Sequence, residues 1–282
     1  MRARLLCGDA AEQLRTLEPE SVNVCVTSPP YYNLRDYGIA GQIGREDTPD
    51  EYIENLVSAF REVRRVLKKD GTLWVNIGDS YTSGNRKSRD RDRKVQGREM
   101  AIRKPTPEGL KPKELLGIPW RLAMALQADG WYLRSDIIWN KLNAMPESVK
   151  DRPTRSHEYI FLLSRSQKYY FDMERIKEPC VTPKGKKWRN KRDVWAVGTT
   201  GFKGDHFAVF PEKLIEPCIL AGCPEGGIVL DPFTGSGTTG VVAMRLNRGF
   251  VGIEINTNYS KIAAERMNAI GTTERLGEVA EK

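Results

Sequence analysis

A serine, two prolines and a tyrosine stand where a predicted buried strand ends. The strand covers residues 22–26, and it is followed by Ser28, Pro29, Pro30 and Tyr31. Each proline fixes its φ angle and lacks an N–H group, so the corner is stiff and its carbonyl groups have no partners in a sheet. Free acceptors beside an aromatic ring suit a planar ligand that carries N–H donors. A lone Ser-Pro-Pro-Tyr is equally compatible with an ordinary turn.

A glycine-rich segment flanked by carboxylates is the second candidate. Residues 235–240 read G-x-G-x-x-G between a predicted strand and a predicted helix, and Glu254 ends the next predicted strand. The pattern is typical of dinucleotide binding, and no lysine follows the glycines as a Walker phosphate loop requires. Asp231 beside the loop would repel a pyrophosphate but attract an ammonium or sulfonium group. A carboxylate at Glu254 suits the two hydroxyls of a ribose.

A nucleoside with a cationic tail and no phosphates is S-adenosylmethionine, and a methyl donor gives the serine–proline corner a purpose. An exocyclic amine on a base is a poor nucleophile, because its lone pair is delocalised into the ring. Acceptors that hold both amine protons while the nitrogen becomes tetrahedral lower the barrier. The Ser28 hydroxyl and the Pro29 carbonyl are the candidate acceptors. Tyr31 is the candidate stacking partner for a base swung out of the duplex.

Alternating strands and helices are predicted to position these residues. The predicted strands cover residues 3–7, 22–26, 71–78, 131–141, 227–233 and 249–255, and residues 157–172 are predicted to form a hairpin that turns at 164–167. The predicted helices cover residues 10–17, 50–69, 112–130, 214–222 and 258–270, with a further helix from about 238. This alternation predicts one α/β domain over residues 1–282, with a doubly wound, mostly parallel sheet and ligands at the carboxyl ends of its strands.

Taken together, the two motifs resemble those of the amino-DNA methyltransferases, which methylate cytosine N4 or adenine N6 with S-adenosylmethionine. In that family a Ser/Asp/Asn-Pro-Pro-aromatic tetrapeptide is catalytic, and a D-P-F-x-G-S-G-T segment binds the donor. Residues 28–31 and 231–238 match these motifs, in the order of the permuted beta group. The resemblance implies a seven-stranded, Rossmann-like, circularly permuted sheet in which the helix at 258–270 leads to the strand at residue 3.

The resemblance also assigns roles to individual residues. Asp9 matches the acid near the adenine of the donor, Glu254 matches the ribose acid, and residues 206–214 are similar to a segment that closes over the methionine end. The implied catalytic residues are Ser28, Pro29, Pro30 and Tyr31. The implied donor-binding residues are Asp9, Phe210, Asp231, Pro232, Phe233, Thr234, Gly235, Ser236, Gly237, Thr238 and Glu254.

Positive charge is confined to two segments. The chain carries a net charge of +8, while residues 86–104 and residues 184–192 each contribute +6, so the rest of the chain is mildly acidic. Two basic segments on an acidic body favour a polyanion such as nucleic acid as the partner over merely solvated loops, and the resemblance implies that this partner is double-stranded DNA. The basic insertion spans residues 80–110, and residues 142–156 and 173–205 are the candidate DNA-recognition segments. The candidate DNA-binding residues are Lys184, Lys186, Lys187, Trp188, Arg189, Lys191 and Arg192.

The identity of the methylated base follows from the first residue of the tetrapeptide. In the resembled family, serine there goes mostly with cytosine N4 and aspartate with adenine N6, so Ser28 favours cytosine and leaves adenine as the alternative. An enzyme acting on RNA or a protein amide is a more remote alternative, because Asn-Pro-Pro-Tyr is usual there. The Pro-Cys pairs at 179–180 and 217–218 do not end predicted parallel strands, which argues against cytosine C5 chemistry. A DNA-binding module with an inactive donor site would have lost one motif, and both are intact.

Composition excludes several other classes. The first residues lack the pattern of a signal peptide, and no apolar run approaches the roughly 18 residues of a membrane span. Five cysteines without zinc-type spacing and two distant histidines predict reduced thiols and no metal site. The resemblance implies a DNA-associated enzyme of prokaryotic or phage origin in a restriction-modification system, and with these features we expect it to be cytoplasmic. A companion restriction endonuclease and a homodimer are left open.

Overall fold

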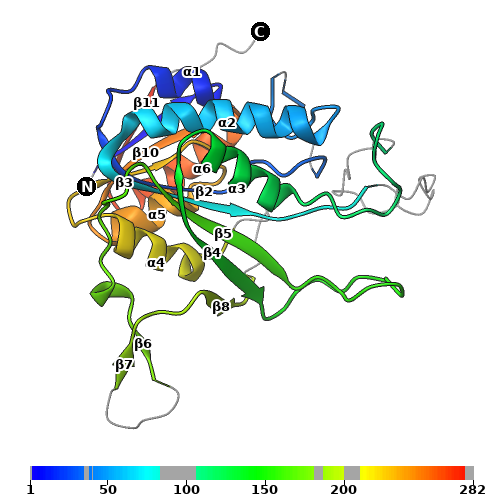
Figure 1. The fold of residues 1–282 in the computed structure, drawn as a ribbon. Coiled ribbons are helices and arrows are strands. Elements are labelled where there is room, and N and C mark those ends of the chain that lie inside the picture. Colours follow the sequence, from blue (N-terminus) through cyan, green and yellow to red (C-terminus); the bar gives the residue numbers. More distant parts are fainter. Residues whose placement is uncertain are drawn as a thin grey trace.

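The computed structural model describes residues 2–34, 38–39, 41–82, 106–180, 187–199 and 210–276. Residues 274–276 are described by their backbone only. One large sheet of nine strands runs through this part of the chain in the order β11-β1-β10-β9-β2-β3-β5-β4-β8 (Figure 1). Its strands are β1 (Arg2–Cys7), β2 (Val22–Thr27), β3 (Leu67–Ile77), β4 (Tyr132–Lys141), β5 (His157–Ser164), β8 (Val194–Val197), β9 (Ile228–Asp231), β10 (Gly249–Glu254) and β11 (Thr272–Leu276).

The sheet is mostly parallel, as the sequence predicts. Only β5 runs antiparallel to its neighbours, β3 and β4. The seven strands expected from the resemblance correspond to this sheet without its two edge strands, β11 and β8. The first strand of the chain, β1, pairs with β10 on one side and with β11 on the other. The first and last strands described therefore lie in the same half of the sheet.

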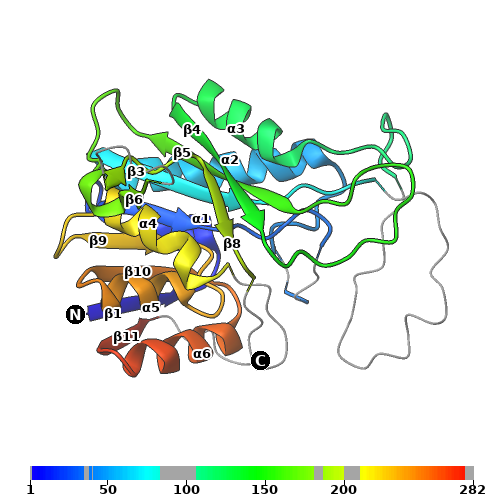
Figure 2. The same cartoon turned by 90° about the horizontal axis from the view of Figure 1, so that it is seen from below.

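Helices cover both faces of the sheet (Figures 1 and 2). One face carries α1 (Ala10–Arg15), α2 (Pro49–Val66) and α3 (Ile118–Ala128), and the other carries α4 (Glu212–Gly222), α5 (Thr238–Arg245) and α6 (Thr257–Asn268). Side chains alternate between the two faces along each strand. On β2, Val24 and Val26 belong to the apolar cluster under α4–α6, whereas Cys25 belongs to the cluster under α1–α3. The arrangement is the expected doubly wound α/β fold.

Local sequence signals explain where the helices begin. Thr48 and Glu51 form a capping box at the start of α2, with Pro49 in the first turn. Pro119 likewise lies in the first turn of α3, so this helix begins at Ile118 and not at residue 112. Proline lacks the N–H group that a helix interior needs, and it is tolerated at the first turn. The helix predicted over 112–130 was therefore wrong over residues 112–117, and α3 also ends two residues earlier than predicted.

The predicted hairpin over residues 157–172 was also wrong. Its first half is β5, but β5 is already paired on both sides, by β3 and by β4. The residues after β5 form no second strand, and their N–H groups bond elsewhere, with that of Tyr170 donating to Asp70 O at 2.9 Å. The antiparallel hairpin is instead β4–β5, joined by the long loop 142–156. The pattern of hydrophobic residues does not say which neighbour a strand chooses.

Parallel pairing brings several carboxyl ends together. Cys7, the last residue of β1, pairs with Glu254 at the end of β10. Asp231, the last residue of β9, pairs with Gly252 on β10, and β9 also pairs with β2. The segments that follow these four strands therefore emerge side by side. Within the described residues, no helix combines the length and apolar character needed to cross a membrane.

Candidate active site

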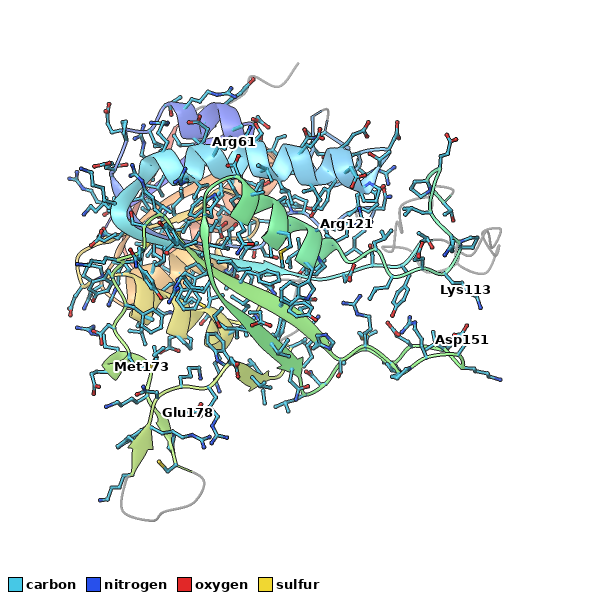
Figure 3. All side chains as sticks on the ribbon, in the orientation of Figure 1. Arg61, Lys113, Arg121, Asp151, Met173 and Glu178 are labelled. Atoms are coloured by element: carbon cyan, nitrogen blue, oxygen red, sulfur yellow. The ribbon has the colours of Figure 1, made fainter. Side chains whose placement is uncertain are left out.

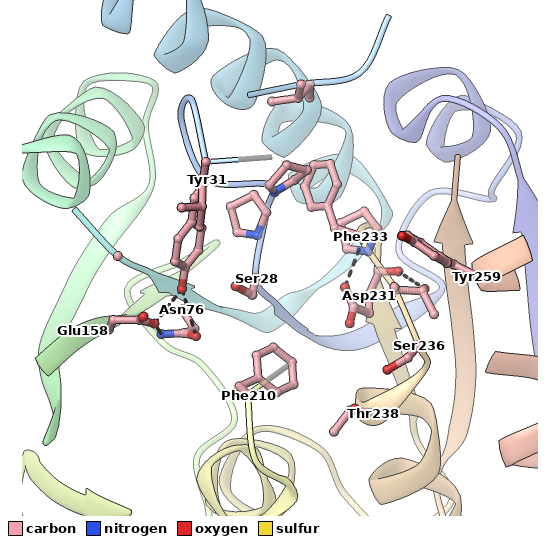
Figure 4. A pocket seen from close by; sticks show the side chains of 18 of the residues that line it. Ser28, Tyr31, Asn76, Glu158, Phe210, Asp231, Phe233, Ser236, Thr238 and Tyr259 are labelled. Atoms are coloured by element: carbon pink, nitrogen blue, oxygen red, sulfur yellow. Dashed lines mark hydrogen bonds between the residues drawn. The ribbon is translucent and has the colours of Figure 1, made fainter. Parts of the chain in front are cut away.

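A cavity of about 730 Å³ lies at the carboxyl ends of these strands. Its wall includes all four residues of the serine–proline corner and nearly all of the expected donor-binding residues. The expected residues that line it are Asp9, Ser28, Pro29, Pro30, Tyr31, Phe210, Asp231, Pro232, Phe233, Thr234, Gly235, Ser236, Thr238 and Glu254. Figure 4 shows Ser28, Phe210 and Asp231 facing the same space. Gly237 is the one expected residue of this set outside the lining.

Hydrogen bonds from two tyrosine hydroxyls hold the serine–proline corner and the residue after it in place. The hydroxyl of Tyr52 on α2 donates a 2.8 Å hydrogen bond to the Pro30 carbonyl. The hydroxyl of Tyr32 donates to Asp47 O at 3.1 Å. No described residue donates to the Pro29 carbonyl, so of the two proline carbonyls it is the one left for a ligand. The roles of Ser28 Oγ and Pro29 O as the two acceptors stay a prediction.

Tyr31 is held at both its ring and its hydroxyl. The hydroxyl donates a 2.6 Å hydrogen bond to Glu158 Oε2 on β5. Gly78 lies against the ring, because a Cβ atom there would come within 2.8 Å of Tyr31 Cε2. Burial, and then the charge of Glu158, raise the pKa of Tyr31 well above its ordinary value, so the phenol stays a donor.

Asp231 is a buried carboxylate at the junction of the two motifs. Its Oδ1 atom accepts hydrogen bonds from Thr27 Oγ1 at 2.6 Å and from the Phe233 N–H at 3.1 Å. Its Oδ2 atom accepts one from Thr239 Oγ1 at 2.7 Å. Burial raises the pKa of Asp231 to about 6, against the opposing effect of these donors. The carboxylate thus joins the corner to the glycine loop, besides placing negative charge beside the cavity.

Glu254 is held by two backbone N–H groups. Its Oε2 atom accepts from the Gly235 N–H at 2.7 Å, and its Oε1 atom accepts from the Asn256 N–H at 2.8 Å. Burial raises the pKa of Glu254 to about 7, with a smaller contribution in the same direction from the charge of Asp231. Because one hydrogen bond leaves each carboxylate oxygen with a further lone pair, both oxygens can still accept from a ligand.

Asp9 has the structural role that its position after a strand suggests, and it also lines the cavity. Its side chain accepts from the Glu12 N–H at 2.9 Å and so caps α1. The preceding Gly8 has φ of 141°, a backbone conformation that residues other than glycine rarely adopt. Its N–H donates to Glu254 O at 3.0 Å. This turn brings Asp9 and Glu254 to one side of the cavity.

The glycine loop requires glycine at position 237. Gly237 has φ of 82°, and a Cβ atom there would lie 2.9 Å from Ala263 Cβ on α6. From the same helix, Arg266 donates to Ser236 O at 2.6 Å and to Ser236 Oγ at 2.9 Å. Close packing of α6 therefore fixes the loop from outside, and Gly237 acts through this packing and not by lining the cavity.

Several residues of the site were missed from the sequence. They are Thr27, Tyr52, Asn76, Lys141, Glu158, Thr239 and Arg266. Thr27 and Thr239 adjoin the two motifs, and their position could have suggested a role. Lys141 and Glu158 come from β4 and β5, whose pairing the sequence did not predict. Arg266 carries no signal, since an arginine in the last turn of a helix is common.

Those candidate DNA-binding residues that the structure describes do not line the cavity. Trp188 and Arg189 form β7, which pairs with β6 (Glu178–Pro179) in a small hairpin that projects from the body (Figure 1). Trp188 is 57% exposed, and Arg189 bonds to Glu178 at 2.9 Å. Of the remaining candidates, Lys187 precedes Trp188, and Lys191 and Arg192 follow Arg189, while Lys184 and Lys186 lie outside the described residues, as does most of the basic insertion.

The loop 142–156 forms a second projection. It carries a cation–aromatic contact, with the Arg152 guanidinium 4.0 Å from the ring centre of Tyr81, and an ion pair from Arg152 to Glu147 at 2.7 Å. Figure 3 shows Lys113 and Asp151, which pair at 2.8 Å, at the far end of the projection. Met145 on this loop lines the cavity and is 72% exposed. The loop thus borders the mouth of the cavity.

Other chemistry finds little support in the described part of the chain. It contains no group of three or more potential metal-ligating His, Cys, Asp or Glu side chains. Cys218 is buried inside α4, and burial raises the pKa of its thiol, which makes it a poor nucleophile. Cys180 follows the short strand β6 and does not line the cavity.

Comparisons with known proteins show which family the chain matches. A family model described as DNA methylase matches residues 22–265. The type II methyltransferase M.SmaI from Serratia marcescens is 61% identical over 264 residues, which are 94% of this chain and 90% of that protein. The type II methyltransferase M.Cfr9I from Citrobacter freundii is 58% identical over 270 residues, which are 96% of this chain and 89% of that protein.

Solved structures show the same fold. TTHA0409 from Thermus thermophilus, a DNA modification methylase solved with S-adenosyl-L-methionine, superposes with a TM-score of 0.65 at 25% identity, over 98% of this chain and all of that one. The cytosine-N4-specific PvuII DNA methyltransferase superposes with a TM-score of 0.71 at 20% identity, over 99% of this chain and 96% of that one.

Proposed function

Since the chain belongs to the DNA methylase family, we propose that it transfers a methyl group from S-adenosylmethionine to the exocyclic N4 amine of a cytosine in duplex DNA. The observation that carries this proposal is the shared cavity. The serine–proline corner and the glycine loop line one space, and the Thr27–Asp231 hydrogen bond ties them together. A methyl acceptor and a methyl donor must meet within bonding reach, and this cavity has a wall suited to each.

The glycine-loop side of the cavity fits S-adenosylmethionine. Both oxygens of Glu254 retain a lone pair for a ribose hydroxyl, and Asp9 lies on the same side. Asp231 places a buried negative charge near the position of a sulfonium. When bound, S-adenosylmethionine supplies a methyl group whose bond to sulfur breaks as its bond to the amine nitrogen forms, and the nitrogen then releases one proton to solvent. Phe210 closes the side nearest to Ser28 and Thr238 (Figure 4).

The opposite wall fits an exocyclic amine. Ser28 Oγ and the Pro29 carbonyl are two acceptors for the two N–H groups of the amine, and the Pro30 carbonyl is already bonded to Tyr52. Because the corner is fixed before a substrate arrives, little reorganisation is needed to reach the transition state. The Tyr31 ring borders the same space and supplies a face on which a flipped base can stack.

Cytosine N4 is proposed over adenine N6 on the identity of Ser28. In the family, serine at this position goes mostly with cytosine, and the PvuII enzyme of the same fold is cytosine-N4-specific. Adenine N6 is the second candidate, since a hydroxyl and a carbonyl can hold either amine. The similarity to type II DNA methyltransferases over almost the whole chain makes RNA or protein a less favoured substrate.

The two projections are proposed to hold the DNA. The β6–β7 hairpin offers an exposed tryptophan among basic residues, and the loop 142–156 borders the cavity mouth. Cations there would neutralise phosphates, which position the duplex without reading its sequence. By analogy with the type II relatives, we also propose that the enzyme acts beside a companion restriction endonuclease that cuts the same sequence when unmethylated.

Transfer of a labelled methyl group tests the reaction. Purified protein with labelled S-adenosylmethionine should label mixed-sequence duplex DNA and leave RNA and bulk protein unlabelled. Ser28→Ala should lower the turnover by at least about 100-fold, on the scale of losing one transition-state hydrogen bond, while calorimetry shows an unchanged donor affinity. Label in RNA or protein, or loss of donor binding in Ser28→Ala, would overturn the proposal.

A further inference from the structure

Three side chains from three different elements converge on the carboxylate of Glu158. Tyr31 donates from the serine–proline corner at 2.6 Å, and Asn76 of β3 donates through Nδ2 at 3.2 Å. Lys141 at the end of β4 forms an ion pair with the other oxygen. Figure 4 shows Glu158 and Asn76 meeting at the hydroxyl end of the Tyr31 ring, across the cavity from Asp231. Nothing in the reaction described so far requires this cluster.

The cluster is built to hold a charged carboxylate still. The side chains of Glu158 and Lys141 are only 13% and 22% exposed, so neither charge is fully solvated. Lys141 supplies the opposite charge, and its Nζ atom also lies 4.6 Å from the ring centre of Trp139. Asn76 is fixed in turn by a 3.1 Å bond from Nδ2 to Tyr159 O. A part-buried charge with two fixed donors and a counter-ion is a strong and directional acceptor.

The fixed acceptor sets the position of the Tyr31 ring. Gly78 lies against the edge of the ring and Glu158 holds its hydroxyl, so the two contacts together fix where the end of the ring lies at the cavity. Without the bond to Glu158, the buried phenol would lose its charged acceptor and keep only weaker contacts, including Asn76 Oδ1 at 3.5 Å. A phenylalanine would make the same ring contacts without this anchor.

We propose that Glu158, held by Lys141 and Asn76, is a positioning residue that fixes the Tyr31 ring through its hydroxyl, so that the ring faces the target base. This inference rests on the proposed function, in which Tyr31 stacks on a flipped base. Glu158 itself acts only through Tyr31. The chain therefore uses the hydroxyl of its tetrapeptide tyrosine, and not only the aromatic ring.

A double-mutant cycle tests this dependence. The variants are Tyr31→Phe, Glu158→Met and the double variant, and the readout is the single-turnover methylation rate at saturating donor and DNA. Methionine has a similar length and no strong acceptor. If Glu158 acts through the tyrosine hydroxyl, each single variant should lose roughly tenfold or more, on the scale of a hydrogen bond to a charged group, and the double variant should lose no more than either. Glu158→Gln keeps an acceptor oxygen and should recover most of the rate.

Two controls separate this role from a structural one. Glu62→Met removes a carboxylate on α2 that pairs with Arg65 at 2.7 Å, and neither residue lines the cavity, so it should leave the rate unchanged. Donor affinity and thermal unfolding should stay close to wild type in Tyr31→Phe. Losses that multiply in the double variant, or a wild-type rate for Tyr31→Phe, would overturn the inference. Failure of the proposed function would appear separately, as no methylation of DNA by the wild-type protein.

Discussion

The hydroxyl of Thr27 donates a 2.6 Å hydrogen bond to Oδ1 of Asp231, across 204 residues of chain. Thr27 immediately precedes Ser28, and Asp231 begins the donor loop. Thr239 bonds the second oxygen of the same carboxylate from the start of α5. The buried carboxylate of Asp231 thus links the serine–proline corner to the glycine loop. We therefore expect a displacement of one of these segments to move the other.

Removing the Thr27 hydroxyl should therefore affect both stability and turnover. Thr27→Val keeps the shape of the side chain but leaves the buried carboxylate short of a donor, which costs about 1–3 kcal/mol. We expect the free energy of unfolding in urea to fall by this amount and the turnover to fall with it. Thr27→Ser retains the hydroxyl and is the matched control. A Thr27→Val protein with wild-type stability would show that the bond contributes nothing.

The raised carboxyl pKa values predict a pH dependence of stability. Burial raises the pKa of Asp231 to about 6 and that of Glu254 to about 7. Between about pH 4 and pH 7 the folded protein therefore holds protons that the unfolded chain has already lost. The contribution of these groups to stability is fully present below about pH 4 and is lost as the pH rises to 7. Asp231→Asn should reduce this slope in urea unfolding measured across that range, and an unchanged slope would exclude Asp231 as a source.

The same two groups predict how donor affinity depends on pH. A sulfonium beside Asp231 favours the charged carboxylate, and so does a ribose bonded to Glu254. We expect the affinity for S-adenosylmethionine to rise between pH 5.5 and pH 8, with proton release on binding at the lower end. Calorimetry in two buffers of different ionisation enthalpy measures the released protons. Proton uptake on binding would contradict the assignment.

The contact between Gly237 and α6 can be separated from backbone strain. Gly237→Ala introduces a Cβ atom 2.9 Å from Ala263 Cβ, in addition to the cost of a φ of 82°. Gly226→Ala carries the same kind of strain, with φ of 77°, but its Cβ would meet open space. We expect Gly237→Ala to weaken donor binding by roughly tenfold or more, while Gly226→Ala costs about 1–2 kcal/mol of stability and leaves donor affinity intact. If both variants weakened donor binding equally, backbone strain alone would explain the effect, and the contact between Gly237 and α6 would have no separate role.

The β6–β7 hairpin should contribute to DNA affinity and not to donor affinity. Replacing Lys187 with Gln and Trp188 with Ala should weaken DNA binding, and the salt slope should fall by about 0.9 for each phosphate that is no longer neutralised. Fluorescence anisotropy at several salt concentrations measures both the affinity and the slope. Lys69→Gln, an exposed lysine near the start of β3 and outside both projections, is the control. A double variant with the wild-type salt slope would place the DNA elsewhere.

The sequence predicted the parts of the site that depend on local pattern. Pro29 and Pro30 constrain the backbone wherever they occur, and the glycines at 235 and 237 adopt the positive φ angles for which glycine is suited. Strands that are apolar along most of their length, such as β2, were placed within a residue or so. These features arise from neighbours in the chain, so one sequence is enough to read them.

The parts that the sequence did not predict depend on which strands pair. Glu158 reaches Tyr31 only because β5 lies between β3 and β4, and the expected hairpin over 157–172 would have placed it beside a different partner. Arg266 reaches Ser236 through helix packing across 30 residues. The edge strand β11 is short and polar, and it is recognisable only once β1 is available to pair with it. Long-range pairing of this kind leaves no periodic signal.

The identity of the methylated base tests the central claim most directly. Mixed-sequence duplex DNA is incubated with the protein and S-adenosylmethionine, digested to nucleosides and analysed by mass spectrometry, with the Ser28→Ala protein in parallel. We predict N4-methylcytosine from the wild-type protein and little or none from Ser28→Ala. N6-methyladenine as the sole product would contradict the cytosine assignment while leaving the fold and the donor site unchanged.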